Sequence, residues 1–224
     1  MARTGTNAHS TLDFEARTET VFSWIRDHTR AIGMAAAAIV VLAAGSWLYL
    51  RTRANQETRA TDSLGRAAQS IEAGNPALAQ SDLERLVRRY PDTYAGRQAV
   101  LLLSEVLFSA GKYQQGITEL ERAAAVSDDQ GVAATAEAQI GAGYEEMKKY
   151  GEAATHYEKA ATKARFQTDK LLFRASAARA HTNAGNKDAA IKIWSELAAD
   201  ETSPVAGEAR IRLGELKARV ARQS

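Results

Sequence analysis

The sequence predicts an all-α protein in which a single N-terminal transmembrane helix is followed by an α-solenoid of about four helical hairpins and a C-terminal capping helix. Three observations support this prediction. Helix-favouring residues dominate a chain of 224 residues with only three prolines, and no stretch alternates as a strand would. Residues 31–50 carry no charge. Beyond them, short turn sequences recur at a constant spacing, which is typical of stacked helical repeats.

The uncharged run reads AIGMAAAAIVVLAAGSWLYL, and at ~1.5 Å per residue it is long enough to cross the ~30 Å hydrocarbon layer of a membrane. Arg30 and Arg51 flank it, and Trp47 and Tyr49 stand where aromatic side chains meet a membrane interface. A buried core helix and a cleaved signal peptide are the alternatives, but the run lacks a polar stripe and the preceding segment is long and acidic for a signal. The predicted domains are an N-terminal tail with a short amphipathic helix (1–30), a transmembrane helix (31–50) and a solenoid domain (51–224).

Small residues within the run offer a packing surface to another membrane helix, because they let two helix backbones approach closely in lipid. Ordinary lipid exposure is the alternative, since alanine is tolerated anywhere in a span. Basic residues are nearly balanced on the two sides of the run, so charge alone does not select an orientation. The candidate packing residues are Gly33, Ala37, Ala44 and Gly45.

Four turn sequences follow the run, and their first residues, Gly74, Gly111, Lys148 and Gly185, are 37 positions apart. Such a period predicts helical hairpins that bury their apolar faces only by stacking on their neighbours. The last expected helix has no partner and would close the end of the solenoid. We expect helices over residues 20–30, 31–73, 77–89, 94–110, 113–126, 131–148, 151–164, 168–184, 188–199 and 204–221.

The pattern within each unit resembles the tetratricopeptide repeat family. The clearest copy covers residues 134–165, where Gly141, Tyr144, Tyr150 and Tyr157 stand at packing positions of the family. The resemblance implies that the first helix of each hairpin lines a concave face that binds proteins. The family's clamp for a peptide C-terminal carboxylate is missing, because leucine and alanine occupy its lysine-type position. The positions carried over to the groove are Gln98, Leu101, Glu105 and Phe108, then Thr135, Ala138, Ala142 and Glu145, then Leu172, Ala175, Arg179 and Thr182.

No arrangement of residues points to catalysis. The chain has no cysteine and four scattered histidines, and it contains no HExxH motif, phosphate-binding loop or nucleophile elbow. We therefore expect a protein that is not an enzyme and that holds neither a cofactor nor a metal. Twenty-nine Lys and Arg against twenty-seven Asp and Glu are spread without a basic run, so a nucleic-acid partner is not expected.

The layout of residues 15–215 also resembles the YfgM-type family of ancillary SecYEG translocon subunits. The resemblance is strongest in the amphipathic segment with Phe22 and Trp24, the uncharged run, and Trp47 and Tyr49 before a long polar helix. It implies a single-pass protein of the bacterial inner membrane with a cytoplasmic N-terminus and a periplasmic solenoid. The implied partners are translocon subunits and periplasmic chaperones, and the implied role is to help exported proteins mature. Two alternatives remain: a structural subunit of another large membrane complex, which would use the span, and a general scaffold for envelope complex assembly, which would use the groove.

Overall fold

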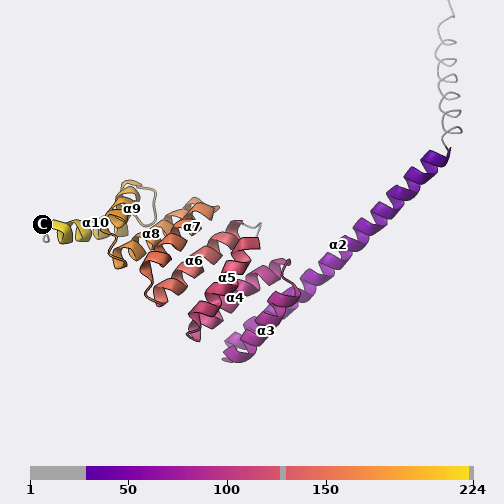
Figure 1. Cartoon of the computed structure of the whole chain (residues 1–224), viewed down its shortest axis with the longest axis horizontal. Coiled ribbons are helices and arrows are strands. Elements are labelled where there is room, and N and C mark those ends of the chain that lie inside the picture. The colour runs from indigo at the N-terminus through magenta and orange to yellow at the C-terminus, as the bar shows by residue number, and fades with distance from the viewer. Residues whose placement is uncertain (1–28, 127–129, 222–224) are drawn as a thin grey trace, which may run out of the picture. The chain divides into compact units, whose positions relative to one another are not determined.

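The computed structural model describes residues 29–126 and 130–221, and within these ranges all regular structure is helical (Figure 1). The prediction of an all-α solenoid is confirmed for this part of the chain. Nearly all of the amphipathic helix expected over residues 20–30 lies outside the described residues. The described helices are α2 (Thr29–Glu72), α3 (Pro76–Arg89), α4 (Tyr94–Ser109), α5 (Tyr113–Val126), α6 (Gln130–Glu146), α7 (Tyr150–Lys163), α8 (Gln167–Asn183), α9 (Lys187–Ala199) and α10 (Ala206–Ala221).

The chain forms two compact units, residues 1–55 and 56–224. In the first unit, the described residues belong to α2, and the large apolar side chains between Met34 and Leu50 are exposed, with Ile39 at 65% and Val41 at 70%. Among the described residues, no helix combines the length and the apolar character that crossing a membrane requires, and the span expected over 31–50 is not found. The four residues predicted to pack against another membrane helix are exposed: Gly33, Ala37, Ala44 and Gly45.

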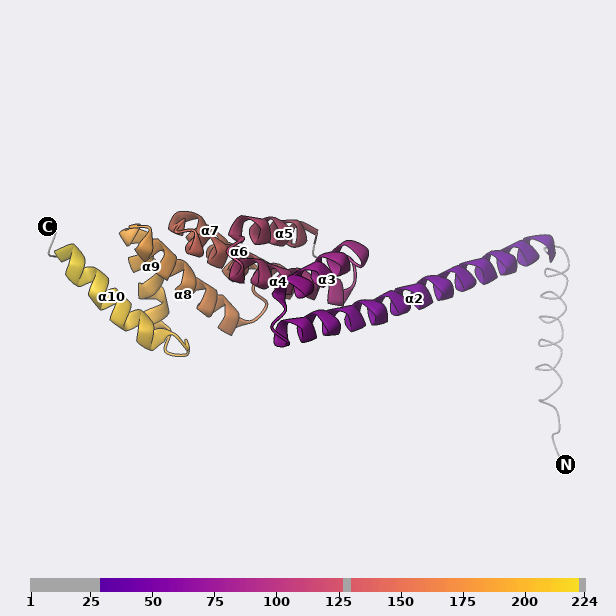
Figure 2. The same ribbon diagram turned by 90° about the horizontal axis from the view of Figure 1, so that it is seen from below.

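In the second unit the helices form consecutive hairpins. The end of α2 (residues 56–72) pairs with α3, and α4 with α5, α6 with α7 and α8 with α9 follow, while α10 packs against α9. Figure 2 shows the second helices α5, α7 and α9 along one side of the stack and the first helices α4, α6 and α8 along the other. The stack therefore has the two layers and the capping helix that the 37-residue period predicted.

The four turns inside the hairpins share one backbone geometry. In each, a residue with positive φ follows the first helix, and its N–H and that of the next residue donate to carbonyls three and five positions back. At the second turn, for example, the N–H of Gly111 donates to the carbonyl of Phe108 at 2.9 Å. This Schellman arrangement satisfies carbonyls that a helix end otherwise leaves unpaired. The positive φ angles are +73° at Gly74, +71° at Gly111, +58° at Lys148 and +79° at Gly185.

Positions related by the period play the same part in the core. On the first helices a small buried residue lets the second helix approach, and a Cβ added at Gly141 would lie 3.0 Å from the ring of Tyr157. On the second helices a large residue fills the space between hairpins. The small buried set is Ala67, Ser104, Gly141 and Ala178, and the large buried set is Leu83, Leu120, Tyr157 and Trp194.

Candidate functional site

The residues predicted to line a groove lie on α4, α6 and α8, and we call their shared surface the α4–α6–α8 face. On α4, Gln98 and Phe108 are half-buried and Glu105 is exposed. Leu101 is only 9% exposed and belongs to the hydrophobic core with Ile117. The structure thus places three of the four α4 residues where a partner could reach them, and it places Leu101 in the packing between hairpins.

Gln139, which the sequence did not mark, connects α4 to α6 on this face. The hydroxyl of Ser104 donates to Oε1 of Gln139 at 3.0 Å, and Nε2 of Gln139 donates to Oε1 of Glu105 at 3.0 Å. The two bonds hold the amide between the helices and orient the Glu105 carboxylate. A single glutamine within a helix carries no sequence signal for such a role, because glutamine is common on exposed helical surfaces.

On α6, Thr135 is exposed, and Ala138, Ala142 and Glu145 are half-buried. Glu145 accepts a hydrogen bond from the hydroxyl of Tyr157 at 2.9 Å. Burial raises the pKa of Tyr157, and the negative charge of Glu145 and the hydrogen bond to it raise the pKa further. The phenol therefore remains a neutral donor, and it positions the Glu145 carboxylate on the face.

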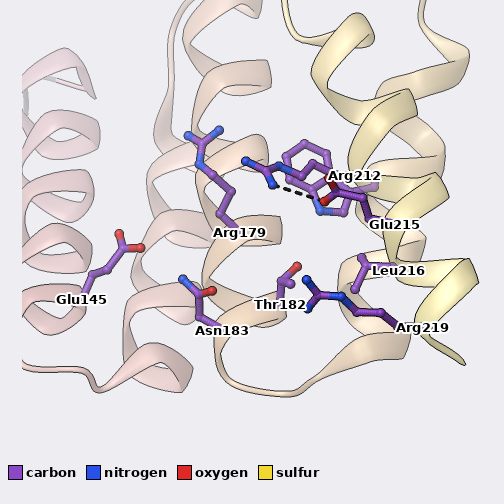
Figure 3. Close-up of a pocket in the computed structure, with 9 residues that line it drawn as sticks. Glu145, Arg179, Thr182, Asn183, Arg212, Glu215, Leu216 and Arg219 are labelled. Carbon is purple, nitrogen blue, oxygen red and sulfur yellow. Dashed lines mark hydrogen bonds and ion pairs between the residues drawn. The ribbon is translucent and has the colours of Figure 1, made fainter. Parts of the chain in front are cut away.

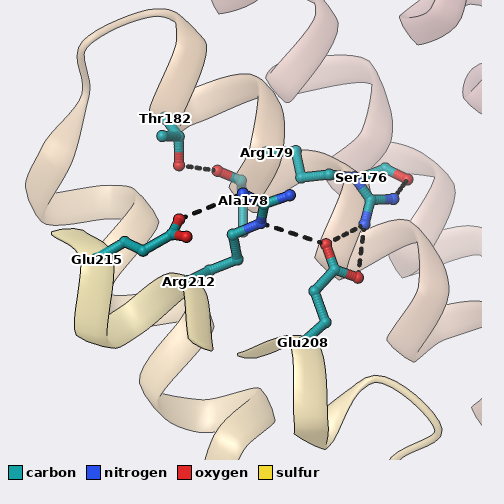
Figure 4. Close-up of polar contacts among 7 residues, drawn as sticks. All are labelled: Ser176, Ala178, Arg179, Thr182, Glu208, Arg212 and Glu215. Atoms are coloured by element: carbon teal, nitrogen blue, oxygen red, sulfur yellow. Dashed lines mark hydrogen bonds and ion pairs between the residues drawn. The ribbon is translucent and has the colours of Figure 1, made fainter. Parts of the chain in front are cut away.

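On α8, Leu172 is 43% exposed, whereas Ala175 is fully buried. Arg179 and Thr182 are half-buried. Nη1 of Arg179 donates to both carboxylate oxygens of Glu208 on α10, at 2.9 and 3.0 Å. Figure 4 shows this contact and the neighbouring polar contacts that join α8 to α10. The capping helix is thus held to the face by one of the predicted groove residues.

A cavity of about 240 Å³ lies at this end of the face (Figure 3). Three predicted residues from two different hairpins meet in its wall, Glu145, Arg179 and Thr182. The rest of the wall consists of residues that the sequence analysis did not assign to a site. Apart from Asn183 and Trp194, these come from the capping helix α10. Because this helix has no counterpart in the repeat, the sequence could not predict which residues its side chains contact. The wall is completed by Asn183, Trp194, Arg212, Glu215, Leu216 and Arg219.

The charges in the cavity wall are only partly neutralised. Nη1 of Arg212 lies 3.3 Å from a carboxylate oxygen of Glu215, and its Nε lies 3.8 Å from Glu208. Within the part of the chain that the structure describes, Arg219 forms no ion pair, and the buried indole N–H of Trp194 has no acceptor. The wall therefore offers a cationic group that has no counterion among the described residues, which suits polar contacts with another molecule.

A second polar cluster lies inside the third hairpin, away from the cavity wall. The carboxylate of Glu137 is 7% exposed and accepts from Nζ of Lys163 at 2.6 Å and from Nδ1 of His156 at 2.9 Å. Burial alone raises the pKa of Glu137, but the hydrogen bonds from Lys163 and His156 and the electrostatic attraction of these two groups outweigh it and leave the pKa below its ordinary value. Among residues 29–126 and 130–221, no group of three or more potential ligands could hold a metal ion.

Stacked helical hairpins with one repeated turn geometry define an α-solenoid protein. The family described as the tetratricopeptide repeat-like domain matches residues 23–171, and the chain belongs to this family. Among solved structures, the chain is similar to nearly identical TPR-like repeats of a Podosopora anserina protein described as a kinesin light chain. The TM-score is 0.58 at 16% identity, covering 75% of this chain and 90% of the other.

The chain is also similar in fold to the MamA RS-1 ArsTM double mutant, with a TM-score of 0.50 at 15% identity, covering 74% of this chain and 97% of the other. At such identities the likeness concerns the fold alone. No curated protein matches the sequence significantly.

Proposed function

We propose that this protein is a non-catalytic scaffold that binds segments of partner proteins along the α4–α6–α8 face. Tetratricopeptide repeat-like domains generally mediate contacts between proteins. The observation that carries the proposal is the cavity at the end of the face, where Glu145, Arg179 and Thr182 from two hairpins meet the capping helix. An extended segment could contact successive first helices and place a side chain in this cavity.

Site-specific photocrosslinking in the full-length protein tests the proposal. Leu172, 43% exposed on α8, would be replaced by a photoreactive phenylalanine derivative, and exposed Lys192 on α9 would serve as the matched control on the other layer. We expect crosslinked proteins from position 172 and none of the same proteins from position 192. Equal crosslinking at the two positions, or none at position 172, would contradict binding on this face.

We propose further that the apolar run of α2 anchors the protein in the bacterial inner membrane as a single pass, with a cytoplasmic N-terminus and a periplasmic solenoid. Four consecutive apolar residues, 39–42, are 65–70% exposed, and consecutive helical residues point in different directions around the axis. This stretch of the helix is therefore apolar on all sides, which suits contact with lipid or with another protein. At the end of the run, the guanidinium of Arg51 lies 5.1 Å from the centre of the Trp47 ring, a pairing suited to a membrane interface.

Alkaline extraction of membranes followed by protease treatment of spheroplasts tests the anchor and its orientation. We expect the full-length chain to remain in the membrane pellet and external protease to digest the solenoid. Release into the alkaline supernatant would contradict the anchor. Retention in the pellet together with protection of the solenoid would contradict the orientation alone.

For the partner, we propose the protein translocon, with the solenoid aiding the maturation of exported proteins. The support is the resemblance of the segment around Phe22, Trp24, Trp47 and Tyr49 to the YfgM-type family, together with the repeat fold. A structural subunit of another membrane complex is the second candidate, and the open space around the exposed small residues favours it, since a Cβ added at Gly45 meets no atom within 4 Å. A general scaffold for envelope complex assembly is the third.

Purification of the full-length protein in mild detergent, followed by mass spectrometry, separates these candidates. We expect translocon subunits and periplasmic chaperones to co-purify. Recovery of a different membrane complex that is lost in a Gly45→Leu variant would favour the second candidate. Recovery of many envelope proteins, with no translocon subunit among them, would favour the third.

A further inference from the structure

The first hairpin contains a second concave surface, a groove of about 490 Å³ between the end of α2 and α3. Its floor includes Leu86, which is 2% exposed, and the half-buried Tyr90. Four arginines and two aspartates line it, so it carries an excess of positive charge, and none of its residues belongs to the α4–α6–α8 face. The charged residues are Arg59, Asp62, Arg66, Asp82, Arg85 and Arg89.

Among the residues that the structure describes, a carboxylate neutralises one of these four guanidinium groups. Arg85 forms an ion pair with Asp82. Arg66 donates to the hydroxyl of Ser63 at 2.9 Å, and Arg89 lies 5.6 Å from the centre of the Tyr90 ring. Within the described part of the chain, no ion pair involves the guanidinium of Arg59 or the carboxylate of Asp62. The groove therefore presents cations whose charge is available to a ligand.

The 37-residue period explains why this surface is open. The residues of the second hairpin that correspond to the α2 side of the groove are small or apolar, and they are buried because the first hairpin packs on them. In the described residues of the second unit, no hairpin precedes α2 to cover the same positions. Polar residues of any kind would keep the uncovered end of the stack soluble. An excess of arginine does more, because it creates a positive electrostatic potential that attracts anions. The corresponding pairs are Arg59 and Gly96, Asp62 and Ala99, and Arg66 and Leu103.

The spacing of the arginines indicates the shape of the anion. Arg59 and Arg66 are seven residues apart on one helix, which places them on one side about 10.5 Å apart along the axis. In a peptide extended as a polyproline II helix, which has three residues per turn and a rise of about 3.1 Å per residue, carboxylates three residues apart lie on the same side and are separated by about 9 Å. Guanidinium groups bind carboxylates through two parallel hydrogen bonds, and the apolar floor formed by Leu86 and Tyr90 can contact the peptide chain. A recess of this form suits an extended chain better than a flat lipid surface.

We propose that this groove binds an extended acidic segment of a partner protein, with Glu or Asp residues three positions apart. The proposal does not depend on the function assigned to the α4–α6–α8 face, because the two surfaces share no residue. It makes the protein a scaffold with two separate docking surfaces, one of them selective for negative charge.

Fluorescence anisotropy with the full-length protein in an uncharged detergent tests the proposal. The probe is a labelled peptide with Glu at every third position, and the same peptide with Gln in those positions is the comparison. We expect the Glu peptide to bind, with an affinity that falls as salt increases. The double variant Arg59→Gln and Arg66→Gln should weaken binding by about tenfold or more, which corresponds to about 1.4 kcal/mol.

The matched control is Arg210→Gln with Lys217→Gln on α10, two exposed cations with the same seven-residue spacing, and it should leave binding unchanged. Circular dichroism checks that both double variants remain folded. If the variant at Arg59 and Arg66 does not fold, a single charge reversal at Arg59 takes its place. Equal loss in both double variants, or equal binding of the Gln peptide, would overturn the proposal. Binding of phosphatidylglycerol vesicles that requires Arg59 and Arg66, with no binding of the Glu peptide, would overturn the choice of a protein ligand.

Discussion

One guanidinium nitrogen of Arg179 contacts both carboxylate oxygens of Glu208, at 2.9 and 3.0 Å, and joins the fourth hairpin to the capping helix. The side chains of Arg179 and Glu208 are 41% and 33% exposed, respectively, so water screens the pair and limits its contribution to stability. Its importance is positional. Arg179 and Arg212 both line the cavity, and Glu208 lies between their two guanidinium groups.

Replacing Glu208 by Gln should loosen the capping helix with a small effect on the rest of the protein. We expect the free energy of unfolding to fall by at most about 1 kcal/mol, and amide hydrogen exchange to accelerate in α10 more than in α4 or α6. Glu215→Gln is the control, because Glu215 pairs with Arg212 inside the same helix. Unchanged exchange in α10 would show that the apolar contacts of Leu216 and its neighbours hold this helix without the ion pair.

Lys148→Gly should stabilise the protein. Lys148 has a φ of +58° at a turn where the other three hairpins have glycine, and a left-handed conformation costs a residue with a Cβ about 1–2 kcal/mol. After the larger backbone entropy of glycine in the unfolded chain is subtracted, we expect a gain of about 0.5–1 kcal/mol in urea unfolding. Gly111→Ala should change stability in the opposite direction by a similar amount. Equal stability of the Lys148→Gly and Lys148→Ala variants would contradict the argument.

Gly96→Ala should destabilise the protein more than its small change in volume suggests. A Cβ at this position would lie 1.9 Å from the carbonyl oxygen of Tyr90, a backbone atom that can move only with the α3–α4 connection. We expect a loss of about 1–3 kcal/mol in the free energy of unfolding. Gly65→Ala is the control within a helix, because a Cβ there meets no atom within 4 Å, and it should gain up to about 1 kcal/mol from helix propensity.

Glu137→Gln should lower stability and flatten its dependence on pH. The folded-state pKa of Glu137 lies below the ordinary value of 4.5, so its contribution is complete above that pH and is lost as the pH falls through the folded-state pKa. Loss of the charged hydrogen-bond partner of Lys163 and His156 should cost about 1.5–3 kcal/mol at neutral pH. Urea unfolding across the acidic range measures both effects. Parallel stability curves for the wild type and the variant would contradict the assignment.

The helices could be predicted closely because the turns between them recur. The sequence predicts a helix over residues 94–110, for example, and the structure has Tyr94–Ser109. The spacing also located the turn at Lys148, although a lysine gives no signal for a positive φ. Whether a first-helix residue remains accessible was harder to predict, because that depends on how the next hairpin tilts across it. Leu101 and Ala175 stand at repeat positions that were predicted to line the groove, and both are buried.

The contribution of the capping helix to the cavity could not be predicted for a different reason. The connection from Asp200 to Val205 has no counterpart in the period, so the rotation of α10 about its own axis follows from contacts such as Arg179 with Glu208 and not from a repeated pattern. The missing counterpart also explains why the sequence assigned Arg212, Glu215 and Arg219 to no site.

The constant step between equivalent turns has a consequence for the length of the molecule. Because each hairpin ends in the same backbone geometry and touches only its neighbours, the distance between the basic groove on the first hairpin and the cavity near the last can change only in whole units. Duplicating residues 112–148 would add one complete hairpin and leave both surfaces intact. The separation of the two surfaces is therefore set by the number of 37-residue repeats between them.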